Sequence, residues 1–170
     1  MFMSFTEVAQ VQHLKPDGTK VSLDADKAVV LPSALGDGLF KQRGEDFDLN
    51  VDDWEITPDD LRRVDSALLK ELRQNLTGLG LPTVPNYYRQ YLPARARQGR
   101  AIFILGFSET ASQMFPDRDI PSDEWKHKLM VAYGGGCAFW YAIYSMERRS
   151  FLILRHDGNR DRSIICNAPK

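Results

Sequence analysis

A stripe of apolar residues at helical spacing is the strongest pattern in the chain. Leu61, Val64, Leu68 and Leu72 follow one another at intervals of three and four residues, so they share one side of an α-helix. Polar residues occupy most positions between them. The pattern predicts an amphipathic helix over about residues 58–75 that packs on a partner through this one side.

The residues before this stripe are typical of a helix start. The Thr57 hydroxyl is suited to cap the helix, and Pro58 fits the first helical position, where no backbone N–H is needed. Asp60 stands three residues after Thr57, in the capping-box position. Gly78 and Gly80 mark the expected end of the helix.

Beyond the helix, the apolar residues form short runs typical of β-strands. Residues 108–124 are polar, include two prolines and predict a loop, and Gly99 lies in a basic turn at 95–100. The predicted strands are 86–92, 101–105, 128–133, 137–144 and 151–154, with a short edge strand at 163–166. One helix followed by strands without further helices predicts an α+β fold with an antiparallel sheet.

The first 49 residues have weaker patterning. A Pro-Asp-Gly-Thr turn at 16–19 separates two short runs, 11–14 and 20–23, and predicts a small hairpin. A short apolar run at 28–31 stops at Pro32. We therefore expect residues 1–49 to be an accessory N-terminal segment and residues 50–170 to form the α+β domain.

A series of landmarks between residues 54 and 159 resembles a group of uncharacterised bacterial proteins with a cystatin-like fold. The residues that carry the resemblance are Trp54, Thr57-Pro58, Tyr88-Arg89-Gln90-Tyr91, Gly135-Gly136, Phe139-Trp140, Tyr144 and Gly158. The chain departs from the family pattern at Gly134 and Ser145, where acidic residues are expected. The resemblance implies one long helix packed on a curved antiparallel sheet of about four strands. It implies a fold more than a function, because such folds include inhibitors, binding modules and enzymes.

Composition narrows the class of protein. The chain has 170 residues, of which 43% are hydrophobic and 26% charged, so it is long enough for one domain with a real core. Its formal charge of −1 argues against a general nucleic-acid binder. The sequence has no run of about 18 apolar residues, and no leader pattern precedes Lys15. These features predict a cytoplasmic protein that binds neither nucleic acid nor membrane.

The distribution of charge is uneven. Residues 45–65 carry nine acidic and two basic side chains, whereas residues 89–100 carry four arginines and no acid. One interpretation is that these segments neutralise each other in the fold. The other is an acidic surface that meets a basic partner. The candidate contacts of such a surface are Asp52, Asp53, Glu55 and Asp59.

No motif in the sequence carries a recognisable chemistry. The glycines at 134–136 lack the Lys-Ser or Lys-Thr of a phosphate loop and are better explained as a bulge or bend. Cys137 lacks a supporting histidine motif for a nucleophile, and His127 lacks metal-ligand spacing. We predict two free thiols and assign no catalytic, cofactor-binding or metal-ligating residue.

A set of polar and aromatic residues in the predicted strand 86–92 has two interpretations. Alternation places Arg89 and Tyr91 on one face of that strand and Tyr88 and Gln90 on the other. These residues are either a polar contact patch or the surroundings of a structural arginine that pairs with a carboxylate beside the helix. The aromatic run at 139–144 is apolar on both faces, which fits a two-sided core, a partner or a second copy of the chain.

Two main hypotheses of function follow, and a structural or oligomerising protein is a third. The first is a non-enzymatic module that binds another protein, in its narrower form a cytosolic inhibitor or immunity protein that blocks a toxin. The alternative is a helix-and-sheet cone that holds a small ligand or acts as an enzyme. Its candidate lining is Tyr88, Arg89, Gln90, Trp140 and His156.

Overall fold

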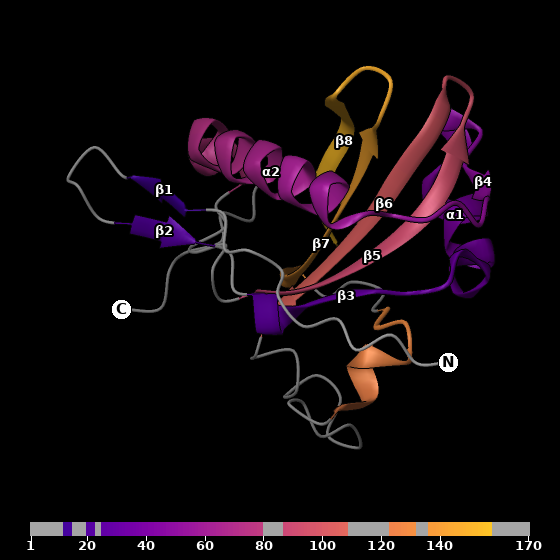
Figure 1. Cartoon of the computed structure of the whole chain (residues 1–170), viewed down its shortest axis with the longest axis horizontal. Coiled ribbons are helices and arrows are strands. Elements are labelled where there is room, and N and C mark those ends of the chain that lie inside the picture. The colour runs from indigo at the N-terminus through magenta and orange to yellow at the C-terminus, as the bar shows by residue number, and fades with distance from the viewer. Residues whose placement is uncertain are drawn as a thin grey trace.

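A computed structural model shows the arrangement of the chain (Figure 1). It describes residues 12–14, 20–22, 25–79, 87–108, 123–131 and 136–157. No helix within these ranges is long and apolar enough to cross a membrane.

The centre of the molecule is a six-stranded mixed sheet. The strand order is β3-β5-β6-β7-β8, and β4 also pairs with β5. Neighbours from β5 to β8 are antiparallel, as are β4 and β5, whereas β3 runs parallel to β5. The strands are β3 (Ala28–Val30), β4 (Asn50–Val51), β5 (Tyr87–Ala96), β6 (Gly99–Ser108), β7 (Gly136–Ser145) and β8 (Ser150–Asp157). In Figure 1 the sheet runs from β3 at the front to β8 at the back.

In the described part of the chain, two α-helices and a small hairpin accompany the sheet. The helices are α1 (Asp37–Arg43) and α2 (Pro58–Leu79). The hairpin pairs β1 (Gln12–Leu14) with β2 (Lys20–Ser22) in antiparallel register, which confirms the hairpin predicted there. Within the described residues, short 3-10 turns lie at Ala25–Lys27, Ser33–Gly36, Glu45–Phe47 and Asp123–Lys126.

The start of α2 is built as its sequence predicts. The Asp60 backbone N–H donates to Thr57 Oγ1 over 3.2 Å, and the Thr57 N–H donates to Asp60 Oδ2 over 3.1 Å. This reciprocal pair satisfies backbone donors that the first helical turn leaves free. The helix extends to Leu79, four residues beyond the predicted end.

The sheet is packed on both faces. On one face, the α2 residues Leu61, Val64 and Leu68 form the helix-side core with residues that include Ile104 and Trp140. On the other face, α1 and its neighbours form the α1-side core: Leu31, Leu39, Phe40, Leu49, Leu92, Ala94, Ala96, Ala101, Phe103, Leu105, Tyr141 and Ile143. The aromatic run of β7 therefore contributes to two cores, which was one of the three interpretations of its pattern.

The predicted fold class is wrong. The chain does not form one long helix on an antiparallel sheet of about four strands, because the sheet is six-stranded and mixed and a second helix packs on it. The extra strands are β3 and β4, which have three and two residues. Runs this short give almost no periodic signal. The parallel pairing of Ala28 with Arg89 joins residues far apart in the sequence, so no local pattern encodes it.

Of the remaining sequence-based predictions, one strand is wrong and several features lie outside the described residues. No strand forms at residues 128–131, where the chain is irregular and Met130 packs into a small aromatic cluster. The turn at 16–19, the glycines at 134 and 135, the edge strand at 163–166, Cys166 and the Cys137 side chain lie outside the described residues. The domain boundary at residue 49 stays a prediction, although β3 and α1 both pack with the main sheet.

Candidate functional site

The candidate lining residues are divided between the two faces of the sheet. Arg89 and Trp140 lie on the helix side, where they adjoin Tyr91 and the α2 residue Asp65. Tyr88 and Gln90 lie on the opposite face, because side chains alternate along β5. The sheet itself separates the two pairs, so they do not line one common pocket.

Arg89 belongs to a buried polar cluster between α2 and β5. Its side chain is fully buried, and its Nε donates to Tyr91 Oη over 2.9 Å and its Nη1 to the Tyr87 carbonyl over 3.2 Å. The Tyr91 hydroxyl donates in turn to Asp65 Oδ1, which lies 4.0 Å from Arg89 Nε. This arrangement matches the interpretation of a structural arginine that pairs with a carboxylate beside the helix.

Burial governs the titration of this cluster. It raises the pKa of Asp65, although the Arg89 charge and the Tyr91 hydrogen bond act against that shift. The pKa of Tyr91 lies well above its ordinary value, chiefly because the hydroxyl is buried and next because the Asp65 carboxylate is close. Burial also raises the pKa of Tyr87 to about 12. The two tyrosines are therefore neutral at physiological pH and act as hydrogen-bonding groups.

Sequence reasoning did not identify Asp65, although a signal was available. Asp65 is four residues after Leu61 and directly follows Val64, so it falls within the apolar stripe of α2. An acidic residue at a core-facing position predicts a buried partner. Arg89, on the β5 face that also carries Tyr87 and Tyr91, was the basic residue that could be expected to pair with it.

Trp140 occupies the centre of the helix-side core. It is fully buried, its ring packs edge-on against Tyr87 with centroids 6.3 Å apart, and its indole lies over Gly106. A Cβ at position 106 would come within 2.0 Å of the indole, so Gly106 is required by this close approach. The Trp140 Nε1 donor is buried without a hydrogen-bond acceptor in the described part of the chain.

His156 is the register neighbour of Trp140 on β8. Cross-strand pairing joins Arg89 to Gly106, Gly106 to Trp140, and Trp140 to His156, so these residues form one row across four strands. The side chain of His156 lies outside the described residues. Sequence reasoning selected three members of this row without knowing that they were aligned.

Gln90 has a structural task on the opposite face. Its Nε2 donates to the carbonyls of Trp125 and Lys128 over 2.6 and 2.7 Å, and its Oε1 accepts the Met130 N–H over 2.9 Å. A buried primary amide thus binds three backbone groups of the irregular segment 123–131. The Gln90 side chain therefore holds this segment against β5. Its hydrogen bonds take the place of the backbone hydrogen bonds that strand pairing would supply.

Tyr88 packs beside Gln90 in the same region. Its ring stacks on Phe107 with centroids 5.4 Å apart and meets Trp125 edge-on at 5.0 Å. Lys27 Nζ lies 5.4 Å from the centre of the Tyr88 ring. Since Tyr88 is buried in this cluster, its ring serves packing rather than contact with an outside molecule.

The predicted acidic contacts are partly neutralised by basic side chains. Arg95 Nη2 lies 2.9 Å from Asp52 Oδ2 and forms an ion pair with it. Asp59 pairs with Arg62 on α2, and Asp53 and Glu55 are exposed on the segment that leads into the helix. The pair of Arg95 with Asp52 supports the interpretation that the acidic segment and the basic turns offset each other.

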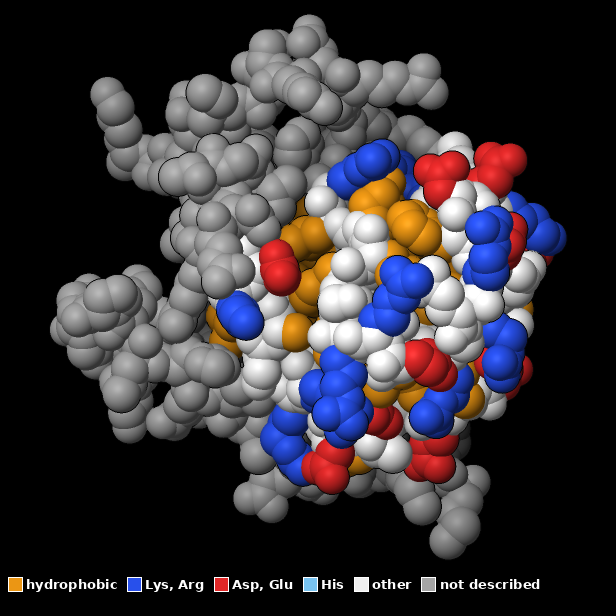
Figure 2. All heavy atoms as spheres, turned by 90° about the horizontal axis from the view of Figure 1, so that it is seen from above, with side chains coloured by type: hydrophobic (Ala, Val, Ile, Leu, Met, Phe, Trp, Pro, Cys, Tyr) orange, Lys and Arg blue, Asp and Glu red, His pale blue; other side chains and the backbone are white. Residues whose placement is uncertain are grey.

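A further ion pair joins the same two segments. Arg97 Nε donates to Asp48 Oδ2 over 2.6 Å, and this hydrogen bond together with the guanidinium charge lowers the pKa of the Asp48 carboxyl. Figure 2 shows the surface from above, where acidic and basic side chains are interspersed with exposed apolar atoms. The charge asymmetry of the sequence is thus weaker on the folded surface.

Sequence reasoning also missed the open edge of the sheet. β8 is the last strand, and no described strand pairs with its outer edge. Its four consecutive apolar residues, Phe151 to Leu154, are all only partly buried. The register shifts by one residue between Ile143 and Tyr144, which marks a β-bulge at Leu152. The four consecutive apolar residues predict a strand. Its position at the edge depends on the order of all strands in the sheet, which no local pattern encodes.

Within the described residues, no cluster of three or more histidine, cysteine or acidic side chains could hold a metal ion. Comparison with known protein families, with curated proteins and with solved structures found no match to this chain. The cystatin-like resemblance therefore stays a prediction that no relative tests, and the fold it implied is replaced by the six-stranded mixed sheet.

Proposed function

We propose that this protein is a binding module that takes up an extended segment of another protein on the outer edge of β8. The observation that carries the proposal is that no strand within the described residues pairs with the outer edge of β8, along which four partly exposed apolar residues follow in succession. An unpaired edge strand presents backbone N–H and C=O groups that a further strand can satisfy. Addition of a strand to such an edge is a general mode of peptide recognition, in which alternate side chains give the specificity.

The bulge at Leu152 restricts which strand can pair. Leu152 and Ile153 both pack toward the α1-side core, whereas Phe151 and Leu154 pack toward the helix-side core. A bulge increases the local twist and discourages indiscriminate edge pairing. The proposed partner segment therefore follows this twist and contacts apolar side chains on both faces of the edge.

Site-specific crosslinking tests this proposal. A photoreactive phenylalanine analogue at Leu152 is expected to crosslink to a distinct protein in the host cell, and the same analogue at the exposed Leu35 is the control. Hydrogen exchange of the β8 amides is expected to slow when the crosslinked protein is added. Crosslinking from both positions alike, or unchanged exchange in β8, would reject the edge as the binding site. Crosslinking to a second copy of the chain would replace the proposal with self-association.

The narrower form of the proposal is an inhibitor or immunity protein that acts in the cytoplasm on a toxin. The partner found by crosslinking decides this point. Expression of a toxic partner is expected to arrest growth, and co-expression of this protein is expected to restore it. Fractionation of host cells tests the location.

The alternative function, binding of a small ligand, is favoured by one observation. The buried Trp140 Nε1 has no acceptor among the described residues, and it lies on the same face as the charged Arg89. An unsatisfied buried donor is unfavourable, and a ligand with a carbonyl or carboxylate oxygen would satisfy it. Binding of such a ligand is expected to shift the tryptophan fluorescence emission of the wild-type protein. Its affinity is expected to fall in Trp140→Phe, which keeps an aromatic ring but removes the donor.

A further inference from the structure

Three aromatic rings form one row across the face of the sheet opposite α2. Cross-strand pairing joins Tyr88 to Phe107 and Phe107 to Phe139, so these side chains lie next to one another on the same face. The rings of Tyr88 and Phe107 stack with centroids 5.4 Å apart, and those of Phe107 and Phe139 stack at 6.3 Å. We call these three residues the aromatic row. Such a row offers a large apolar surface to a further aromatic ring.

The segment 123–131 covers the aromatic row with two anchoring side chains. Trp125 lies edge-on to the first two rings of the row, with centroids 5.0 and 6.2 Å apart, and Met130 packs in the same cluster. Both anchors are buried, whereas the three residues that follow Trp125 are exposed. In Figure 1 the segment begins with the orange turn below the sheet, on the side away from α2. It thus contacts the sheet as a bound peptide does, through a few buried side chains.

Gln90 supplies hydrogen bonds to the backbone of this segment. Its fully buried amide donates to two backbone carbonyls and accepts the Met130 N–H. The N–H groups of His127 and Lys128 donate within the segment, to the Glu124 carbonyl. Since the bonds from Gln90 go to main-chain groups, which every peptide carries, they do not require the sequence of this segment. The two anchors alone select side chains.

We propose that the aromatic row and Gln90 form a peptide-binding site, which segment 123–131 occupies in an autoinhibitory contact until a segment of another protein displaces it. The partner segment carries a large aromatic residue and an apolar residue five positions later, the spacing of Trp125 and Met130. While the chain's own segment is in place, the rings of the row pack only within the chain. A segment tethered to its site acts at a millimolar effective concentration, so only a tighter competitor displaces it.

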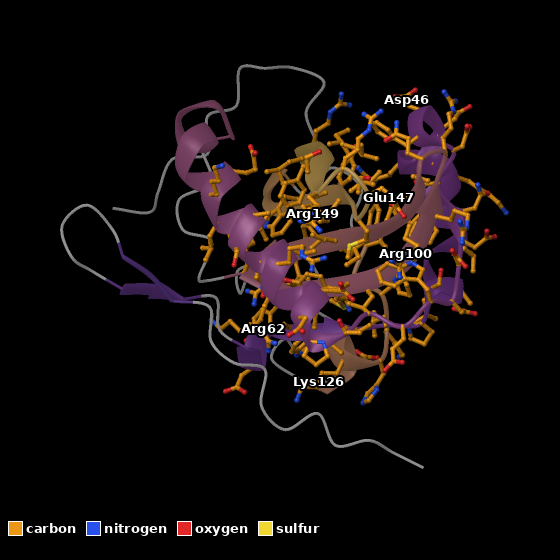
Figure 3. The ribbon with its side chains drawn as sticks, turned by 45° about the horizontal axis from the view of Figure 1, so that its top comes forward. Asp46, Arg62, Arg100, Lys126, Glu147 and Arg149 are labelled. Atoms are coloured by element: carbon orange, nitrogen blue, oxygen red, sulfur yellow. The ribbon has the colours of Figure 1, made fainter. Side chains whose placement is uncertain are left out.

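This site is distinct from the outer edge of β8. The aromatic row belongs to β5, β6 and β7, and Phe139 lies near the start of β7, whereas the turn that leads into β8 follows the end of β7. Figure 3 shows Lys126, the neighbour of Trp125, at the lower edge of the molecule, away from Glu147 and Arg149 in that turn. The chain therefore has a second site for a partner, which does not depend on the edge.

Competition in the wild-type protein tests the proposal. The probe is a synthetic peptide with the sequence of residues 123–131, labelled with a fluorophore so that its mass differs from that of the chain's own segment. Hydrogen exchange in residues 123–131 of the protein is expected to accelerate as the peptide reaches millimolar concentrations and displaces the segment. A control peptide with alanine in place of tryptophan is expected to leave this exchange unchanged. Unchanged exchange with both peptides, or equal acceleration by both, would reject the site.

Removal of one anchor is expected to open the site to the probe. Trp125→Ala is expected to bind the labelled peptide about tenfold more tightly than the wild type does, as measured by fluorescence anisotropy. Trp54→Ala is the matched control, because it removes a partly buried tryptophan that packs against the helix-side core, and it is expected to leave peptide binding unchanged. Urea unfolding checks that both variants fold. Met130→Ala removes the other anchor and repeats the measurement if Trp125→Ala does not fold.

The remaining outcomes separate this site from the β8 edge. Gln90→Leu in the Trp125→Ala background removes the main-chain hydrogen bonds and is expected to reverse the gain in affinity. Equal affinity of Trp125→Ala and the wild type for the peptide would show that the segment does not compete, and would reject the proposal. Slower exchange in β8 without a change in residues 123–131 would assign the peptide to the edge, which rejects this site and supports the proposed function. Faster exchange in residues 123–131 with unchanged β8 supports this site alone.

Discussion

A fully buried guanidinium is stable only if its surroundings supply acceptors and a counter-charge. Arg89 obtains a phenolic oxygen, a backbone carbonyl and a carboxylate from Tyr91, Tyr87 and Asp65. These residues come from β5 and α2, so the cluster fixes where the helix lies on the sheet. Replacing such a buried ionic cluster with apolar residues of similar volume is often neutral or stabilising, whereas removing one partner is strongly destabilising.

Removal of one member of the cluster is expected to be more harmful than removal of all of them. Arg89→Met leaves the Asp65 carboxyl and the Tyr91 hydroxyl buried without their partner, and we expect a loss of about 3–5 kcal/mol in the free energy of unfolding. The triple variant that also carries Asp65→Leu and Tyr91→Phe removes all three polar side chains and is expected to recover most of that loss. Urea unfolding followed by tryptophan fluorescence measures both. A triple variant as unstable as Arg89→Met would contradict this account.

The titration of Asp65 predicts a pH dependence of stability. Its pKa in the folded protein lies above the ordinary aspartate value of 3.8, so the folded state holds the proton more tightly than the unfolded state does. The stability from this group is complete below about pH 3.8 and is lost as the pH rises through the folded pKa. Asp65→Asn has no such titration. The free energy of unfolding of the wild type relative to Asp65→Asn is therefore expected to fall as the pH rises above 4. A constant difference from pH 3 to 8 would show that burial does not raise this pKa.

At the scale of elements, the sequence predicted those helices and strands whose stabilising contacts lie close together along the chain. The capping residues Thr57 and Asp60 and the stripe from Leu61 to Leu72 identified α2, because these interactions lie within a few residues of one another. The three-residue strand β3 depends on pairing with a strand more than 50 residues later, which no short window contains. The candidate site had the same limit: Arg89 was recognisable, but the identity of its carboxylate required the contact between α2 and β5.

The segment 123–131 shows how one side chain can replace a strand pairing. Gln90 binds three backbone groups of this segment. The substitution Gln90→Leu keeps a side chain of similar size but removes every hydrogen-bonding group from it. Each buried backbone group left without its partner costs about 1–3 kcal/mol. Gln90→Leu is therefore expected to open the segment locally rather than to unfold the sheet. Faster hydrogen exchange in residues 123–131 with little change in β6 is the expected result.

A matched control is available in the turn after β5. Gln98 is exposed there, and Gln98→Leu is expected to leave exchange in residues 123–131 unchanged. If Gln90→Leu also leaves this exchange unchanged, the three hydrogen bonds do not hold the segment in place.

At the scale of the whole molecule, residues 25–49 complete the sheet and cover one of its faces. β3 adds a parallel strand beside β5, and Phe40 of α1 packs on Phe103 with ring centroids 5.5 Å apart. Gly36 and Gly44 permit close packing here, since a Cβ at either position would meet Phe40 or Leu49 within 2.6 Å. This segment pairs with β5 and contributes to the α1-side core, which bears directly on whether it is accessory.

Shortening the chain from its N-terminus tests that question. A chain that begins at residue 50 lacks the buried side chains of Leu31, Leu39, Phe40 and Leu49. At about 1.5–3 kcal/mol each, their burial contributes roughly 6–12 kcal/mol, which is comparable to the whole stability of a typical domain. This chain is expected to bind a hydrophobic dye and to lose cooperative unfolding, because the α1-side core is uncovered. A chain that begins at residue 25 keeps β3 and α1 and is expected to unfold cooperatively, with a urea midpoint close to that of the full protein. If the chain from residue 50 unfolds with the same midpoint, residues 1–49 are accessory and the sheet is stable without them.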